Sequence, residues 1–236
     1  MKVLIFDVDG TLADTEKLGH LSACNDAIRQ LNLGFQWSWE EYVEMVRTLP
    51  GNINRFIKYL QEKNFPPNEI DELAQKFGPL KVKLYNEKYL PLLELRPGIE
   101  KIIQQAIEKN IRLCIVSSSH EDQIKSLVEN LLTPYASKFE RIFGKETGKK
   151  VGEDGVLYQI CLKEMGVDAK DTLTIEDAHD GATAAMKVRI PTAVFYNDYT
   201  KGSDFSGAII IDDSIEKYDL EDLMEAQKKA INKNFN

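Results

Sequence analysis

Two acidic residues near the start of the chain follow an apolar run and have the spacing of metal ligands. The run Lys2–Phe6 leads directly into Asp7, Asp9 and Gly10. Carboxylates two residues apart at a strand end point the same way, and such close like charges repel unless a cation or a shared proton relieves them. A hard divalent cation with oxygen ligands, most simply Mg²⁺, meets this need. A surface turn is the alternative, because Asp and Gly are common turn residues.

Three serines follow a second apolar run. Ser117, Ser118 and Ser119 come directly after Arg112–Val116. Hydroxyl and backbone N–H groups just before a helix form an anion site, so a phosphate could bind here. Helix capping is the alternative for at least one of the serines, since Ser119 with Asp122 has the pattern of a cap.

A second acidic pair and a group of lysines complete the set. Glu176 and Asp177 follow another apolar run, and unpaired carboxylates near a core are costly if they are purely structural. Lys145, Lys149 and Lys150 lie between the serines and this pair, where a solvated loop is the simpler interpretation. In combination, a metal could bridge the two acidic pairs while serine and lysine neutralise a phosphoryl group. The set therefore predicts a site for phosphoryl transfer.

These residues need strands whose carboxyl ends meet at one edge of a sheet. Five short, nearly continuous apolar runs are typical of strands buried on both faces, and helical patterns alternate with them. The alternation predicts a doubly wound parallel α/β sheet, which binds ligands at the carboxyl ends of its strands. The expected strands are 2–6, 112–116, 172–175, 192–195 and 208–211, and the expected helices among them are 99–109, 120–130, 155–165 and 220–229.

A helical segment interrupts this alternation after the first strand. Ser38 and Glu41 form a capping box in front of one of its helices, and Gly78–Pro79 separates the last two. We expect a core of residues 1–14 and 94–236 and a helical domain at 15–93. The expected helices of that domain are 16–32, 39–47, 53–63, 68–77 and 79–90.

The composition narrows the class of protein. Of the 236 residues, 43% are hydrophobic and 29% charged, which is typical of a globular chain rather than a disordered one. A net charge of −8 argues against nucleic acid or an anionic membrane surface as the main partner. No apolar stretch is long enough to span a membrane, and no secretion signal is readable. Three distant cysteines, Cys24, Cys114 and Cys161, are typical of buried thiols in a reducing compartment, so we expect a cytoplasmic protein.

The chemical features together resemble the four motifs of the haloacid dehalogenase-like hydrolase superfamily. The matching residues are Asp7-Val-Asp9-Gly-Thr11, Ser117, a lysine near residue 150 and Glu176-Asp177. The resemblance covers nearly the whole chain and implies a Rossmann-like core with an inserted helical cap. Leu12-Ala-Asp-Thr-Glu16 and Leu95-Arg-Pro-Gly98 are most similar to the branch of CbbY-type sugar-bisphosphate phosphatases and β-phosphoglucomutases.

The resemblance implies a catalytic role for each matched residue. Asp7 would be the nucleophile that forms an aspartyl-phosphate, and Asp9 the general acid for the leaving alkoxide and then the base for water. Ser117 would hydrogen-bond a phosphoryl oxygen. Lys150 stands where the family's lysine is expected and would stabilise the developing charge, but the motif carries a short insertion here and Lys149 is a rival.

The resemblance also implies a Mg²⁺ site. Asp7, the backbone carbonyl of Asp9 and Asp177 would hold the ion, with Glu176 as a direct or water-mediated partner. Dehalogenases of the superfamily lack the second aspartate, since a halide leaves without a proton. The presence of Asp9 therefore favours phosphate esters as substrates.

Residues outside the motifs would contact the rest of the substrate. The candidates are Asp14 near the cap hinge, Arg47 in the cap, and Ser118. For Arg47, a solvated charge at a helix end is an equal alternative.

Two departures from the branch bear on the substrate. CbbY-type and mutase sequences carry a histidine where this chain has Gly19, and His20 comes one position later. On a helix, this shift rotates the imidazole by roughly 100°. The cap loop reads Pro50-Gly51-Asn52, without the lysine expected there to meet a second phosphate.

We therefore expect a Mg²⁺-dependent phosphatase that acts on a small phosphorylated metabolite, above all a sugar phosphate. A β-phosphoglucomutase-type sugar phosphomutase is the alternative. A binding module on an inactive hydrolase fold is a third, but it predicts the loss of a motif residue and all are present. We expect a monomer or weak dimer with neither nucleic acid nor membrane as partner.

Overall fold

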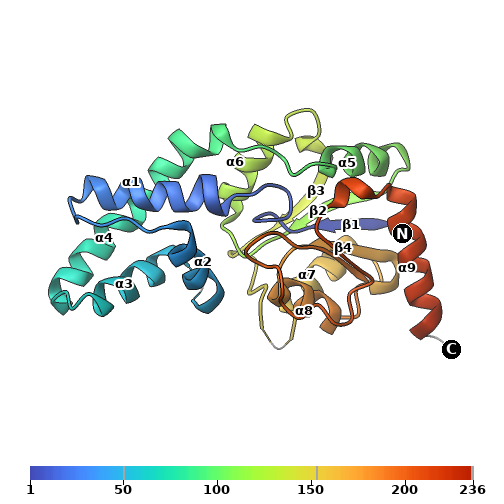
Figure 1. Ribbon diagram of the computed structural model, residues 1–236. Coiled ribbons are helices and arrows are strands. Elements are labelled where there is room, and N and C mark those ends of the chain that lie inside the picture. Colours follow the sequence, from blue (N-terminus) through green and yellow to red (C-terminus); the bar gives the residue numbers. More distant parts are fainter. Residues whose placement is uncertain (50, 153, 235–236) are drawn as a thin grey trace. The chain divides into compact units, whose positions relative to one another are not determined.

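The protein is described by a computed structural model that covers residues 1–49, 51–152 and 154–234. The chain divides into two compact units, whose elements are labelled in Figure 1. The first, here called the sheet unit, comprises Met1–Ala13 and the chain from Glu94 onward, and the second, the helical unit, is Asp14–Leu93. The chain leaves and re-enters the sheet unit at one place, because Ala13 and Leu95 form an antiparallel β-bridge. The helical unit is thus an insertion in the sheet unit.

The sheet unit contains a six-stranded parallel sheet in the order β3-β2-β1-β4-β5-β6. This topology confirms the predicted doubly wound α/β fold class. β1 lies between β2 and β4, and every residue of β1 and β4 is buried, as their apolar runs predict. The strands are β1 Val3–Phe6, β2 Arg112–Val116, β3 Phe139–Phe143, β4 Thr172–Glu176, β5 Thr192–Phe195 and β6 Ile210–Asp212.

Helices cover both faces of this sheet (Figure 1). Val3 and Ile5 of β1 pack in one apolar cluster with residues of α7 and α8. The alternate residues of β1 point to the opposite face, on which Figure 1 shows α5. The helices of the sheet unit are α5 Ile99–Glu108, α6 Glu121–Leu131, α7 Val156–Met165, α8 His179–Lys187 and α9 Leu220–Asn234.

Two elements of the sheet unit were not expected from the sequence. β3, Phe139–Phe143, is an edge strand in which only Phe139 and Phe143 are buried, so it has no continuous apolar run. α8, His179–Lys187, contains Gly181 and several alanines rather than large apolar residues, and its helical periodicity is therefore weak. The last strand also begins later than expected, at Ile210 rather than Ala208.

The helical unit contains no strand among its described residues, as predicted. The capping box of α2 is confirmed, because Ser38 Oγ accepts from Glu41 N (3.1 Å) and Glu41 accepts from Ser38 N (2.9 Å). Its elements are the π-helix η1 Glu16–Leu21, the α-helices α1 Ser22–Gln30, α2 Trp39–Thr48, α3 Asn52–Glu62 and α4 Pro67–Leu84, the π-helix η2 Tyr85–Tyr89 and the 3₁₀ turn η3 Leu90–Leu92.

The predicted break at Gly78–Pro79 is wrong, since α4 continues through Pro79 to Leu84. Apolar residues on both sides of the proline pack against the same cluster, Phe77 before it and Leu80 and Leu84 after it. The continuous apolar face outweighs the one backbone hydrogen bond that a proline inside a helix cannot make.

Two further expectations concern the cysteines and membrane-spanning segments. All three cysteines are buried free thiols, as predicted, and the sulfur atoms of Cys114 and Cys161 lie 3.6 Å apart. Trp37 is buried in the core of the helical unit. Within the described ranges, no helix combines the length and the apolar character needed to cross a membrane.

Phe77 anchors the core of the helical unit, because its ring is fully buried and stacks on Phe56 with centroids 4.0 Å apart. We expect Phe77→Ala to lower the free energy of unfolding by about 3–5 kcal/mol. Val82→Ala, on the same helix but 39% exposed, should cost no more than about 0.5 kcal/mol. Urea unfolding followed by tryptophan fluorescence measures both, since Trp37 and Trp39 are the protein's two tryptophans. Equal losses would contradict the placement of Phe77.

Candidate active site

The carboxyl ends of three adjacent strands bring the predicted site residues of the sheet unit together. Asp7 follows β1, Ser117 follows β2, and Glu176 is the last residue of β4. β1 pairs with both neighbours, Phe6 being in register with Ile115 and Ile175. Asp7 is therefore level with Glu176, and Ser117 comes one residue further along its strand at the same end of the sheet; each of the three side chains is buried.

Lys150, and not Lys149, enters this cluster. It comes from the loop between β3 and α7, is 5% exposed, and its Nζ donates to Asp7 Oδ1 and to Glu176 Oε1 (2.6 Å). Lys149 is exposed. Burial alone would lower the pKa of Lys150, but the charges of Asp7 and Glu176 outweigh it and raise the pKa, so this ammonium stays charged.

Three of the predicted metal ligands are close enough to share one ion. Asp7, Glu176 and Asp177 each offer a carboxylate oxygen, and these oxygens lie within 4.8 Å of one another. Burial raises the pKa of Asp7 to about 7, with Lys150 opposing and Glu176 and Asp9 adding to the shift. Burial, with Asp7 and Glu176, also raises the pKa of Asp177 well above its usual range. One ammonium does not neutralise this much buried acid, so the cluster fits a divalent cation.

Polar side chains hold Asp177 and Glu176 in place; Thr11 stood in the first motif, whereas Asn197 and Tyr158 were not singled out from the sequence. Asn197 Nδ2 donates to Asp177 Oδ2 (2.8 Å) and Thr11 Oγ1 donates to Asp177 Oδ1 (3.2 Å). Tyr158 Oη donates to Glu176 Oε1 (2.9 Å). Asn197 follows β5, and a polar residue after an apolar run was the available signal. Tyr158 lies within α7 and carried no such signal.

Two glycines let the backbone approach the carboxylates closely. A Cβ on Gly181, in the first turn of α8, would lie 2.1 Å from Glu176 Oε1. Gly10 has φ +86°, and a Cβ there would lie 2.4 Å from Asp177 Oδ2. A larger residue at either position would displace the carboxylate that it meets.

The serine segment after β2 contacts the second aspartate rather than capping a helix. Ser119 Oγ donates to Asp9 Oδ2 (2.6 Å), and Ser119 N donates to Ser117 Oγ (3.1 Å). The capping interpretation of Ser119 is wrong, because His120 is the N-cap of α6 and makes no side-chain cap bond. Ser117 is buried and Ser118 is exposed. Because Ser117 Oγ accepts from a backbone N–H, its own hydroxyl proton is directed elsewhere.

The other predicted contacts belong to the helical unit. Asp14 is its first residue and Arg47 lies in the last turn of α2, and both are exposed. Their role in substrate binding stays a prediction. In the cap loop, Pro50 lies outside the described residues, while Gly51 precedes α3 with φ +86°.

His20 lies in the π-helical segment η1, where the extra residue of a π-turn changes the helical register. Its ring stacks on Tyr85 with centroids 4.5 Å apart, and its Nδ1 is 2.9 Å from the Nζ of Lys81. One residue of a π-helix still turns the side chain by a large angle, so the displacement of the imidazole stays a prediction.

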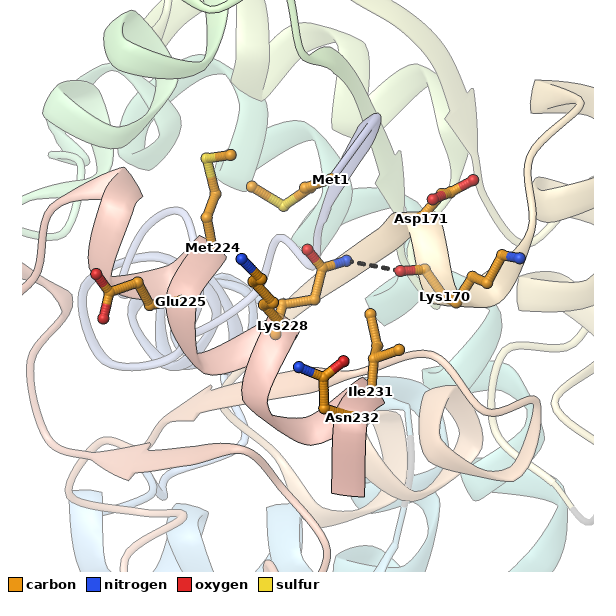
Figure 2. Close-up of a pocket in the computed structure, with 9 residues that line it drawn as sticks. Met1, Lys170, Asp171, Met224, Glu225, Lys228, Ile231 and Asn232 are labelled. Atoms are coloured by element: carbon orange, nitrogen blue, oxygen red, sulfur yellow. Dashed lines mark hydrogen bonds between the residues drawn. The ribbon is translucent and has the colours of Figure 1, made fainter. Parts of the chain in front are cut away.

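A separate pocket of about 290 Å³ lies at the amino ends of the strands, opposite the ends that carry the carboxylates (Figure 2). It is lined by Met1, by Lys170 and Asp171 in front of β4, and by residues of α9. Gln227 Nε2 donates to Lys170 O (3.1 Å) on its wall. None of the predicted site residues lines this pocket, so it is distinct from the carboxylate cluster.

Comparisons with known proteins identify the family of this chain. A family model described as haloacid dehalogenase-like hydrolase matches residues 4–195. The CbbY protein of Cupriavidus necator is 30% identical, with 89% of this chain and 84% of that protein covered. A CBBY-like protein of Arabidopsis thaliana is 29% identical, with 92% and 72% covered.

Solved structures of similar fold include members of the same family. CbbY from Rhodobacter sphaeroides in complex with phosphate is 27% identical, with a TM-score of 0.74 and with 92% of this chain and 96% of that chain covered. A variant of that protein has been solved with xylulose-(1,5)bisphosphate. β-Phosphoglucomutase from Clostridium difficile is 19% identical at a TM-score of 0.73, which shows a shared fold. The chain belongs to the haloacid dehalogenase-like hydrolases, as a phosphoric monoester hydrolase of the CbbY-like branch.

Proposed function

We propose that the protein is a Mg²⁺-dependent phosphatase that hydrolyses a small phosphorylated metabolite, a sugar phosphate above all, through an aspartyl-phosphate on Asp7. One observation supports this most directly. A buried ammonium, Lys150, and three buried carboxylates share one edge of the sheet, with the hydroxyl of Ser117 after the neighbouring strand. The sugar-bisphosphate complex of the Rhodobacter CbbY supports the substrate class.

Asp7, Asp177 and the backbone carbonyl of Asp9 would hold the ion, with Glu176 beside them. When bound, Mg²⁺ neutralises charge on the phosphoryl oxygens. Lys150 adds a fixed positive charge that needs no reorganisation during the reaction, because Glu176 and Asp7 hold its Nζ in place. Ser117 donates a hydrogen bond to a phosphoryl oxygen.

Asp7 and Asp9 divide the covalent and the proton-transfer chemistry between them. A carboxylate oxygen of Asp7 attacks phosphorus, and the bond from phosphorus to the leaving alkoxide breaks. Asp9 gives its proton to that alkoxide and then takes one from the water that hydrolyses the aspartyl-phosphate. Ser119 fixes the Asp9 side chain by donating to its Oδ2. The helical unit acts as a cap that keeps bulk water from the intermediate.

The phosphomutase alternative uses the same first step but returns the phosphoryl group to a sugar hydroxyl instead of water. Product analysis with a hexose 1-phosphate distinguishes them, since free phosphate indicates a phosphatase and a rearranged sugar phosphate a mutase. Gly19 stands where mutase sequences of this branch carry a histidine, and this departure weakens the mutase alternative.

The first test is metal-dependent release of phosphate. We expect the purified protein to release phosphate from a sugar phosphate with Mg²⁺ and to stop when EDTA removes the metal. Asp7→Asn should lower the rate by at least about 1,000-fold, because it removes the nucleophile. Release by Asp7→Asn at the wild-type rate would contradict the assignment of the nucleophile.

The two neighbouring lysines offer a matched pair of variants. Lys150→Met should lower kcat about 100- to 1,000-fold at saturating Mg²⁺, because it removes a fixed charge from the site. Lys149→Met, which removes an exposed charge one residue away, should stay within about twofold of the wild type. The reverse order in steady-state kinetics would identify Lys149 as the motif lysine.

The metal site predicts a pH-dependent stabilisation by Mg²⁺. Folding raises the pKa of Asp7 from 3.8 to about 7, so the metal-free fold binds a proton that the unfolded chain releases, and its stability falls as the pH rises through this window. Mg²⁺ needs the ionised carboxylate, so it should raise the melting temperature more at about pH 8 than at about pH 6. Asp177→Asn should abolish the Mg²⁺ effect. Equal shifts at both pH values in thermal melts would rule out this site.

A further inference from the structure

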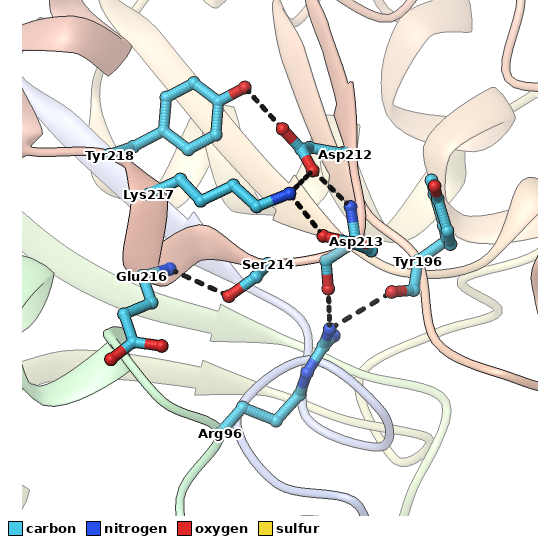
Figure 3. Close-up of polar contacts among 8 residues, drawn as sticks. All are labelled: Arg96, Tyr196, Asp212, Asp213, Ser214, Glu216, Lys217 and Tyr218. Carbon is cyan, nitrogen blue, oxygen red and sulfur yellow. Dashed lines mark hydrogen bonds and ion pairs between the residues drawn. The ribbon is translucent and has the colours of Figure 1, made fainter.

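Arg96 lies where the chain re-enters the sheet unit, and its guanidinium binds the backbone of three separate segments. Within the described part of the chain, its four acceptors are carbonyl oxygens, those of Gly10, Phe195 (2.7 Å), Tyr196 (3.2 Å) and Asp213 (3.1 Å). Figure 3 shows the guanidinium pointing to Tyr196 and Asp213. None of these acceptors is a carboxylate, so the arginine serves to hold backbone rather than to form an ion pair.

The first of these segments carries Asp9. Arg96 Nη1 donates to the carbonyl of Gly10, and Arg96 N donates to Leu12 O (2.8 Å). The same turn is closed by Gly10 N donating to Ala13 O (2.8 Å). Arg96 therefore holds the turn that follows Asp9 through both its side chain and its backbone.

The second segment carries the residue that orients Asp177. The carbonyls of Phe195 and Tyr196 come directly before Asn197, whose Nδ2 donates to Asp177 Oδ2 (2.8 Å). Asn197 Nδ2 also lies 3.4 Å from the Gly10 carbonyl that Arg96 binds. One carbonyl thus joins the turn of Asp9 to the support of Asp177.

We propose that Arg96 is a positioning residue that sets Asp9, the acid, and Asp177, the metal ligand, in the geometry of the reaction. This rests on the proposed phosphatase function. It deepens that function by assigning two separable effects to one side chain. Loss of the guanidinium frees the turn after Asp9, which weakens proton donation to the leaving group, and frees Asn197, which weakens metal binding.

The two effects can be read separately from kcat/KM. An alkyl phosphate needs a proton on its leaving oxygen, whereas p-nitrophenyl phosphate releases a stable phenolate and needs none. We expect Arg96→Met to lower kcat/KM about 100-fold for glycerol phosphate and no more than about 10-fold for p-nitrophenyl phosphate. The Mg²⁺ concentration for half-maximal activity should rise about 10-fold. A loss of folded protein alone would lower kcat/KM for both substrates by the same factor and leave the half-maximal Mg²⁺ concentration unchanged.

Two variants serve as controls. Asn197→Ala should raise the half-maximal Mg²⁺ concentration about 10-fold while leaving the ratio of the two substrates within about twofold of the wild type. Arg112→Met removes an arginine that binds Glu140 (2.6 Å) and the carbonyl of Met165 (2.7 Å) at the start of β2. It should leave both the ratio and the Mg²⁺ dependence unchanged.

The outcomes separate the two proposals. If the wild type releases no phosphate from these two substrates and none from a sugar phosphate, the proposed function fails. The positioning role is overturned if the wild type is active and Arg96→Met lowers kcat/KM for both substrates by the same factor while the half-maximal Mg²⁺ concentration stays unchanged. Should Arg96→Met show no cooperative unfolding transition by circular dichroism, Arg96→Gln, which keeps an N–H donor, is measured by the same two ratios and decided by the same criteria.

Discussion

Buried negative charge at one edge of the sheet is the constraint on which the rest of the sheet unit depends. Asp7, Glu176 and Asp177 meet there, and among the described residues one ammonium, that of Lys150, contacts Asp7 and Glu176. Charges removed from water are costly unless they are paired or hydrogen-bonded. Hydroxyl and amide groups therefore hold Asp177, a phenol group holds Glu176, and the Lys150 ammonium holds Asp7. A bound cation would balance the negative charge that remains on the carboxylates.

Strand ends and close backbone contacts in the sheet unit satisfy this constraint. Parallel strands deliver one acidic residue from each of two neighbours to the same point, and β1 lies centrally enough to be covered on both faces. The glycines at positions 10 and 181 then bring backbone to within contact of the carboxylates. The buried apolar strands therefore also serve the polar site. Strand ends that were more exposed to solvent would let water hydrate the acidic groups and weaken their electrostatic field.

Residues at strand ends were predictable from the sequence, and residues that support them were not. Asp7, Ser117 and Glu176 follow apolar runs, so their meeting follows from the parallel topology. Tyr158 and Ser119 act through contacts across the sheet that local pattern does not encode. The edge strand β3 was missed because one side of it faces solvent, where apolar residues are not required. Pro79 was misread because tertiary packing outweighed a local helix-breaking signal.

The β-bridge between Ala13 and Leu95 has a consequence for how such proteins diversify. The inserted helices begin and end at neighbouring points of the sheet unit, and the entropy of closing a loop between two fixed points grows only slowly with its length. An insertion of a different size or architecture can therefore replace this one at little cost to the sheet. Selectivity for new metabolites can then evolve in the insertion while the reactive groups are inherited intact.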